Sequence, residues 1–155
     1  TRARRCRARA RGGGSVGLVA LSTANAKASL AFVPAVALGI MCNALVCLAV
    51  WMCYGARTTI DRIITIVPPI AAFAAAGFEH SIANIYFIPM GLFIKAGAPD
   101  SFWASIGKTP ADFPNLTWDN FLIGNLLPVT IGNIIGGSIM VAAVYWFVYL
   151  RKRKE

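Results

Sequence analysis

Charged side chains are scarce in this chain, and most of them are gathered at its two ends. Only 14% of the 155 residues are charged, against about 25% in typical soluble domains, while 57% are hydrophobic. Ten of the fifteen basic residues lie within positions 1–11 or 151–155. A surface that binds nucleic acid needs Lys and Arg spread over a folded face. The composition therefore predicts a membrane protein and gives no support to nucleic acid as a partner.

Metal ligands and catalytic pairs are equally scarce. The chain has one histidine, and its four cysteines form no Cys-x-x-Cys pair. Three of the cysteines lie in one apolar run, where small buried side chains are the simplest interpretation. No nucleophile–base pair, phosphate-binding glycine loop or His/Cys cluster is present. The sequence thus predicts no enzyme activity, no metal site and no cofactor.

The first 22 residues differ from the rest because they are rich in Arg and Gly and contain no acidic side chain. Such a stretch is typical of a transit peptide, and it can also arise from a misassigned gene start. We expect residues 1–22 to be a disordered or artefactual leader. The folded part is then predicted to comprise residues 23–155.

Three long apolar segments predict an all-α membrane protein. About 20 apolar residues cross a bilayer, and residues 32–54 form such a run without a single charge. Residues 63–94 are too long for one plain span and carry Glu79 and His80 near their middle. A charged side chain inside a continuous membrane helix costs roughly 3 kcal/mol. We therefore expect two half-helices with a break near residues 75–80, followed by a third span over residues 120–150.

The charges of the loops predict how the spans are oriented. The linker at residues 55–62 and the C-terminus lie on one side and together carry six basic residues. The loop at residues 95–119 carries two lysines and three aspartates. The positive-inside rule places the linker and the C-terminus in the cytoplasm.

Polar side chains inside the apolar segments are the candidates for function. Glu79 and His80 lead, since an ionisable group within a span is by default a functional-site hypothesis; a buried structural pair is the alternative. Asn43 and Asn133 either join helices by hydrogen bonds or line the break. Phe73 either packs in the core or forms a hydrophobic constriction beside His80. A GxxxG pattern at residues 132–136 predicts close packing against a neighbouring helix.

Three stretches resemble the signature sequences of the formate/nitrite transporter family. They are NALVCLAVWM at residues 43–52, GFEHSIAN at residues 77–84 and NLLPVTIGNIIGG at residues 125–137. The resemblance covers residues 23–155. It implies an aquaporin-like protomer of two inverted three-span repeats, of which this chain supplies spans four to six, with the middle one interrupted. It also implies a homopentamer with one pore in each protomer.

The resemblance further implies transport of small monovalent anions such as formate or nitrite across a lipid bilayer, with a bacterial inner (plasma) membrane as the expected location. His80 is then the central pore histidine. The other implied roles are constriction for Phe73 and Val46, hydrogen bonding near the centre for Asn43 and Asn133, attraction of anions for Lys27 and support of the broken helix for Glu79.

The expected mechanism is one of proton transfer. A narrow apolar pore opposes a free anion, while a weak-acid anion becomes neutral by taking a proton, and histidine titrates in the required pH range. Three alternatives stay open: a channel for water or neutral solutes, a structural membrane subunit, and a fragment that is inactive without the first repeat. Transport that is insensitive to pH and to His80 would favour the first of these.

Overall fold

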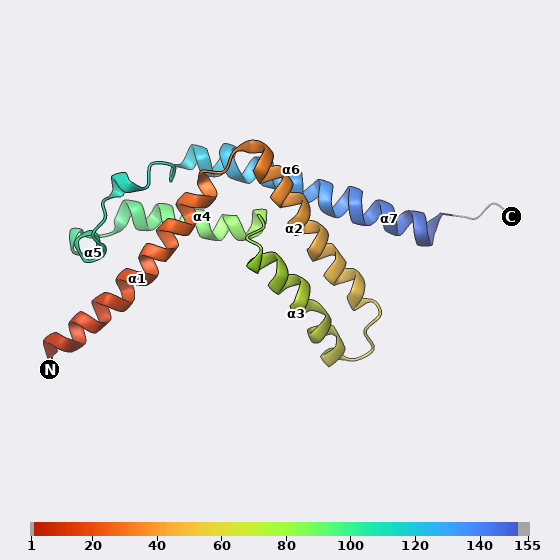
Figure 1. Cartoon of the computed structure of the whole chain (residues 1–155), viewed down its shortest axis with the longest axis horizontal. Helices are drawn as coiled ribbons and strands as arrows, with labels where there is room; N and C mark the ends of the chain where they lie inside the picture. The colour runs from red at the N-terminus through yellow and green to blue at the C-terminus, as the bar shows by residue number, and fades with distance from the viewer. Residues whose placement is uncertain (1, 152–155) are drawn as a thin grey trace. The chain divides into compact units, whose positions relative to one another are not determined.

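The computed structural model describes residues 2–151, with side chains from residue 14 onward, and every regular element in that range is a helix (Figure 1). The described residues fall into two units. Unit 1 holds helix α1 (Arg2–Ala28) and the stretch Ile82–Leu126, and unit 2 holds Phe32–Ser81 and the residues from Leu127 onward. Each unit is thus built from two stretches that are far apart in the sequence.

Unit 2 contains the most apolar helices. Helix α2 (Phe32–Cys53) and the continuous helix Asn120–Leu150 are each long and apolar enough to cross a membrane. In unit 1, helices α4 (Ser81–Gly97) and α5 (Asp100–Ile106) form a bent pair that would make a third span if it is counted as one. Within unit 2 the long helix comprises the elements α6 (Leu127–Ile134), η3 (Ile135–Ala142), α7 (Ala143–Tyr145) and η4 (Trp146–Leu150), of which η3 and η4 are π-helical.

Glycines let α2 approach the long helix closely, which confirms the packing role predicted for the GxxxG pattern. A β-carbon on Gly132 would lie 3.1 Å from the Cα of Gly39, and one on Gly136 would lie 3.0 Å from the Cα of Ile40. A β-carbon on Gly132 would also overlap the backbone oxygen of Val36, and one on Gly136 would overlap that of Ile40. Neither position has room for a side chain, so the two backbones are in direct contact. In a membrane the hydrophobic effect does not drive helices together, because the lipid is itself apolar. Small residues stabilise such crossings because they allow close van der Waals packing.

Helix α3 (Thr59–Ala75) also belongs to unit 2, and its start is fixed by a capping box. The backbone N–H of Asp61 donates to the Thr58 hydroxyl, and the N–H of Thr58 donates to the Asp61 carboxylate, at 3.1 and 3.0 Å. These bonds satisfy donors that the first helical turn leaves without partners. The helix therefore begins at a defined residue, Thr59, within the predicted linker at residues 55–62.

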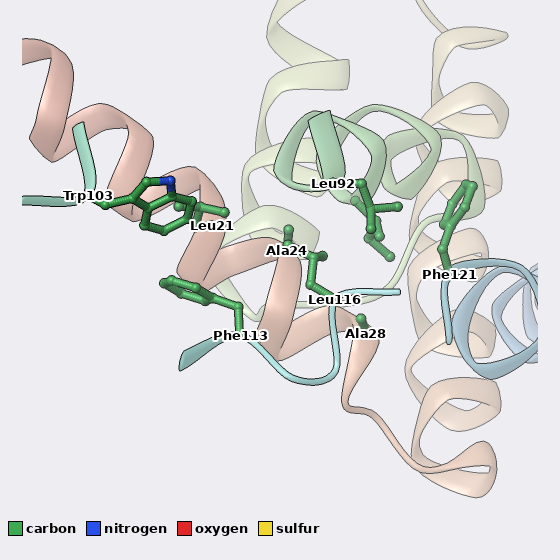
Figure 2. Packing of buried hydrophobic residues seen from close by; sticks show 9 residues of the cluster. Leu21, Ala24, Ala28, Leu92, Trp103, Phe113, Leu116 and Phe121 are labelled. Carbon is green, nitrogen blue, oxygen red and sulfur yellow. The ribbon is translucent and has the colours of Figure 1, made fainter. Parts of the chain in front are cut away.

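Unit 1 is built around a hydrophobic cluster. It contains α1 (Arg2–Ala28), most of α4 (Ser81–Gly97), α5 (Asp100–Ile106), the short turn η1 (Pro110–Asp112) and the π-helical η2 (Asn120–Leu126). Figure 2 shows Trp103 and Phe113 against the part of α1 that carries Leu21 and Ala24. The other buried members are Ala28, Ile88, Leu92, Leu116 and Phe121.

The N-terminal region differs from the expected leader, because α1 runs through the predicted boundary at residues 22 and 23. Leu21 and Ala24 are fully buried on one face of this helix. A β-carbon on Gly17 would lie 2.6 Å from the ring of Phe102, so this glycine marks a close helix contact. A helix packed in this way is not a disordered leader over residues 14–22; the side chains before residue 14 lie outside the described ones.

The loop after α5 is held to α4 by polar contacts. The Lys95 ammonium donates to the backbone oxygens of Phe113 and Leu116, at 2.8 and 3.1 Å. Thr109 and Asp112 form a second capping box, and the Thr109 backbone N–H is the main group that holds the pKa of the Asp112 carboxyl below its usual range. The loop therefore has a defined conformation in unit 1.

Candidate functional site

The break between α3 and α4 is a turn that only glycine adopts easily. Gly77 has φ +68°, in the left-handed region. The N–H of Phe78 donates to the Phe73 carbonyl at 3.1 Å, and that of Gly77 donates to the Ala74 carbonyl at 3.2 Å. This pair of bonds is the Schellman motif, which satisfies the last carbonyls of a helix. It ends α3 before Glu79, so that Glu79 and His80 lie in non-helical backbone.

The side chain of Asn133 holds the residues on both sides of His80. Its Nδ2 donates to the carbonyl of Glu79 at 3.1 Å and to that of Gly39 at 2.9 Å. Its Oδ1 accepts from the backbone N–H and the hydroxyl of Ser81, both at 3.0 Å. These four bonds use both donors and both acceptor positions of the amide. One buried side chain of α6 therefore fixes the backbone before and after His80 and ties it to α2.

Asn43 adds a second bond between α2 and α6. Its Nδ2 donates to the backbone oxygen of Asn133 at 2.6 Å. Asn43 is partly buried, whereas Asn133 is 6% exposed. Hydrogen bonds between helices in an apolar environment contribute about 1 kcal/mol each. The two asparagines thus act together on the backbone that carries the break.

The rings of His80 and Phe73 lie next to each other. Their centroids are 6.2 Å apart and their planes are inclined by 38°. Phe73 comes from the last turn of α3, and both rings are partly buried. Glu79 is only 3% exposed. The two neighbours Glu79 and His80 therefore differ in burial, with the imidazole the more accessible of the two.

The remaining predicted residues lie further along these elements. Val46 is partly buried in α2, one turn after Asn43. Lys27 lies in the last turn of α1, in unit 1, with its ammonium 6.0 Å from the centroid of the Phe87 ring. The structure thus brings five predicted site residues together in unit 2, namely His80, Phe73, Glu79, Asn43 and Asn133.

Two further asparagines were not singled out from the sequence. In unit 1, Asn84 Nδ2 donates to Asn125 Oδ1 at 2.7 Å, and Asn125 Nδ2 donates to the carbonyl of Lys27 at 2.8 Å. Both side chains are fully buried. They hold the turn of α1 that carries Lys27. The signal that could have found them is the one that found Asn43 and Asn133, an amide within an apolar segment.

His80 is the side chain of this site that can exchange a proton near neutral pH. A neutral imidazole both donates and accepts hydrogen bonds, and this one lies beside a phenyl ring in fixed backbone. Among the described residues, no group of three or more His, Cys, Asp or Glu is suited to hold a metal ion. The chemistry that the side chains offer is hydrogen bonding and proton exchange by His80.

Comparison with known proteins gives a consistent result. The chain matches the formate/nitrite transporter family over residues 7–147. It is 50% identical over 139 residues to the formate channel FocA of Escherichia coli K12, covering 90% of this chain and 49% of FocA. It is 45% identical over 136 residues to the formate channel FocB of the same strain, covering 88% of this chain and 48% of FocB.

A solved structure shares the fold. A pentameric formate channel with formate bound superposes with a TM-score of 0.84 at 47% identity, covering 90% of this chain and 55% of that one. The chain spans about half the length of these relatives. Their names are those of channels and not of enzymes, and the family match begins well before residue 23. The chain belongs to the formate/nitrite transporter family.

Proposed function

We propose that this chain forms part of a transmembrane path for small monovalent anions, formate foremost, with His80 at its centre. The observation that carries the proposal is the hold of Asn133 on the backbone at both sides of His80, within the break of an apolar segment. A structure builds non-helical backbone at membrane depth only where protein or a water-filled cavity surrounds it. The relatives named as formate channels support formate as substrate; nitrite follows from its similar size and charge.

The proposed mechanism uses the imidazole as a proton donor. A formate anion that leaves water for an apolar passage loses its hydration, which is very costly for a charge. The protonated form of His80, the imidazolium, gives its proton to formate, which leaves a neutral imidazole and neutral formic acid. Formic acid releases the proton to water on the far side and becomes formate again, and the imidazole takes a new proton from water before the next anion arrives. Phe73 and Val46 narrow the path and exclude hydrated ions. Asn133 positions His80, Glu79 supports the break, Asn43 offers hydrogen bonds to the passing molecule, and Lys27 attracts anions to the entrance.

Transport is proposed for the complete protein that carries this chain, because the relatives are about twice as long. We propose a homopentamer in the plasma membrane of a bacterium, with the C-terminus in the cytoplasm. The similarity to a formate channel that is itself pentameric supports this assembly. This chain would supply the second three-span repeat of each protomer.

The test is uptake of labelled formate and nitrite into proteoliposomes between pH 5 and pH 8, by the complete protein and its His80→Ala variant. We expect saturable, pH-dependent uptake that the variant loses, because the alanine cannot exchange a proton in this range. Ile139→Val is a matched control, since Ile139 is 62% exposed on η3; it is expected to transport as the parent does.

Two outcomes would contradict the proposal. Uptake that is independent of pH and of His80 would refute proton transfer by His80, as the alternative channel for water or neutral solutes predicts. A folded, oligomeric parent without any anion uptake would leave the structural-subunit interpretation.

A further inference from the structure

Two adjacent glycines of η3 meet α2 in different ways. A β-carbon on Gly136 would lie 2.9 Å from the carbonyl carbon and 3.0 Å from the Cα of Ile40, both backbone atoms. A β-carbon on Gly137 would lie 2.5 Å from Nδ2 of Asn43 and 3.0 Å from Sγ of Cys47, both side-chain atoms. Backbone yields only if a helix moves, whereas a side chain can rotate away. Gly136 therefore sets the distance between the helices, and Gly137 sets the space available to the Asn43 amide.

The amide that Gly137 accommodates is held in one orientation. Asn43 Nδ2 donates to the backbone oxygen of Asn133 at 2.6 Å. A carbonyl oxygen only accepts hydrogen bonds, so the amide must present its nitrogen there. A methyl group at residue 137 would overlap this nitrogen and turn the amide off its partner. The hydrogen bond from Asn43 to the Asn133 carbonyl therefore requires a glycine at position 137.

We propose that Gly137 is a positioning residue of the transport site, which keeps the Asn43 amide on the Asn133 carbonyl. The consequence for transport rests on the proposed function, because it needs Asn43 to act on the passing molecule. The effect of Gly137 on the orientation of the Asn43 amide does not rest on the proposed function, because it follows from the contact between the two residues. The same carbonyl belongs to the residue that holds the backbone around His80. Gly137 thereby acts on the residues around His80 through the side-chain amide of Asn43.

The experiment is a double-mutant cycle in the complete protein. Gly137→Ala is made in the parent and in an Asn43→Ala background, and each protein is assayed for formate uptake and for its melting temperature. In the parent we expect the half-saturation concentration for formate to rise by about two- to tenfold, the equivalent of one hydrogen bond. In the Asn43→Ala background Gly137→Ala is expected to leave the half-saturation concentration unchanged, because the amide that it would displace is already gone. The melting temperature there should be unchanged or higher, since Ala favours helix.

Two neighbouring variants serve as controls. Ser138 is exposed on the same helix, so Ser138→Ala is expected to leave uptake and melting unchanged. Gly136→Ala meets backbone and is expected to lower the melting temperature and the yield of folded protein. That loss should be the same in the Asn43→Ala background, which separates a displaced helix from a misplaced amide.

The inference is overturned if Gly137→Ala has the same effect in both backgrounds, since it would then act without Asn43. It is equally overturned if Gly137→Ala leaves both half-saturation and melting as in the parent. Should the parent take up no formate at all, the proposed function fails. The melting temperatures alone then decide whether Gly137 and Asn43 act as a pair: additive changes refute the pairing, and non-additive changes support it.

Discussion

Four asparagine side chains, Asn43, Asn84, Asn125 and Asn133, form hydrogen bonds between helices of this chain. An amide that is buried without partners costs several kcal/mol in an apolar medium, roughly 4–8 on the cyclohexane scale. Such a side chain therefore tolerates few arrangements of its surroundings. Asn133 is tightly constrained, because all of its hydrogen-bonding positions are in use.

Asn133→Asp tests this constraint with a nearly identical shape. The carboxylate still accepts from Ser81, but it has no donor for the carbonyls of Glu79 and Gly39 and places a charge against them. Leaving buried groups without partners costs about 1–3 kcal/mol each. We expect a melting temperature lower by several degrees and loss of formate uptake, both measured on purified protein.

The matched control for this prediction is Asn115→Asp. Asn115 lies in the loop after η1 and is only partly buried. Its replacement should leave melting and uptake as in the parent. An Asn133→Asp protein as stable and active as this control would show that the four bonds do not position the break.

Helix α3 has a defined residue at each end, a capping box at Thr58 and a Schellman turn at Gly77. Pro68 and Pro69 lie inside it and remove two backbone donors. Well-defined ends are needed in a helix that is short of internal hydrogen bonds. The C-terminal end at Gly77 also determines that Glu79 and His80 lie outside the helix.

Gly77→Ala tests the turn at the end of α3. A β-carbon there would meet open space, so the expected penalty comes from the positive φ alone, about 1–2 kcal/mol. We expect a melting temperature lower by a few degrees. Gly97→Ala is the control, because Gly97 also faces open space but lacks a positive φ and ends α4. It should melt at or above the parent, since Ala favours helix; equal melting of both variants would refute the strain.

The all-helical class and the interrupted middle segment could be predicted because both depend on local runs of apolar residues and on charges within them. Helix α1 could not, since its glycines suggest a flexible stretch, and their use appears only in the structure, where Gly14 meets Ser105 and Gly17 meets Phe102. The rarity of polar groups in the spans was enough to select His80 and Asn133. It could not show that Asn133 binds on both sides of His80, because those residues lie more than fifty positions earlier in the chain.

Over the whole molecule, each of the two units combines two separate stretches of sequence. The chain passes from one unit to the other near residues 31, 81 and 126, the second time directly after Ser81. The long helix Asn120–Leu150 makes the third passage without a break. No contiguous fragment therefore contains one unit without part of the other, and the chain should fold cooperatively.

The proposed assembly gives a prediction at this scale. Native mass measurement of the complete protein in mild detergent is expected to give five copies of the chain, by similarity to the pentameric formate channel. A closed ring satisfies identical heterologous contacts on every subunit. A stable monomer or dimer under conditions that preserve the fold would contradict the pentamer.

Asn133 positions His80 only indirectly. Its hydrogen bonds go to the backbone of Glu79 and to the backbone and hydroxyl of Ser81, the residues on either side of His80. None of these bonds involves the side chain at position 80. We therefore expect the backbone there to keep its conformation when that side chain is replaced. A glutamine, lysine or cysteine there would present a different chemical group at the same point along the path. Under the proposed function His80 sets what the path admits, so we expect substitutions at this position to change selectivity without loss of the fold.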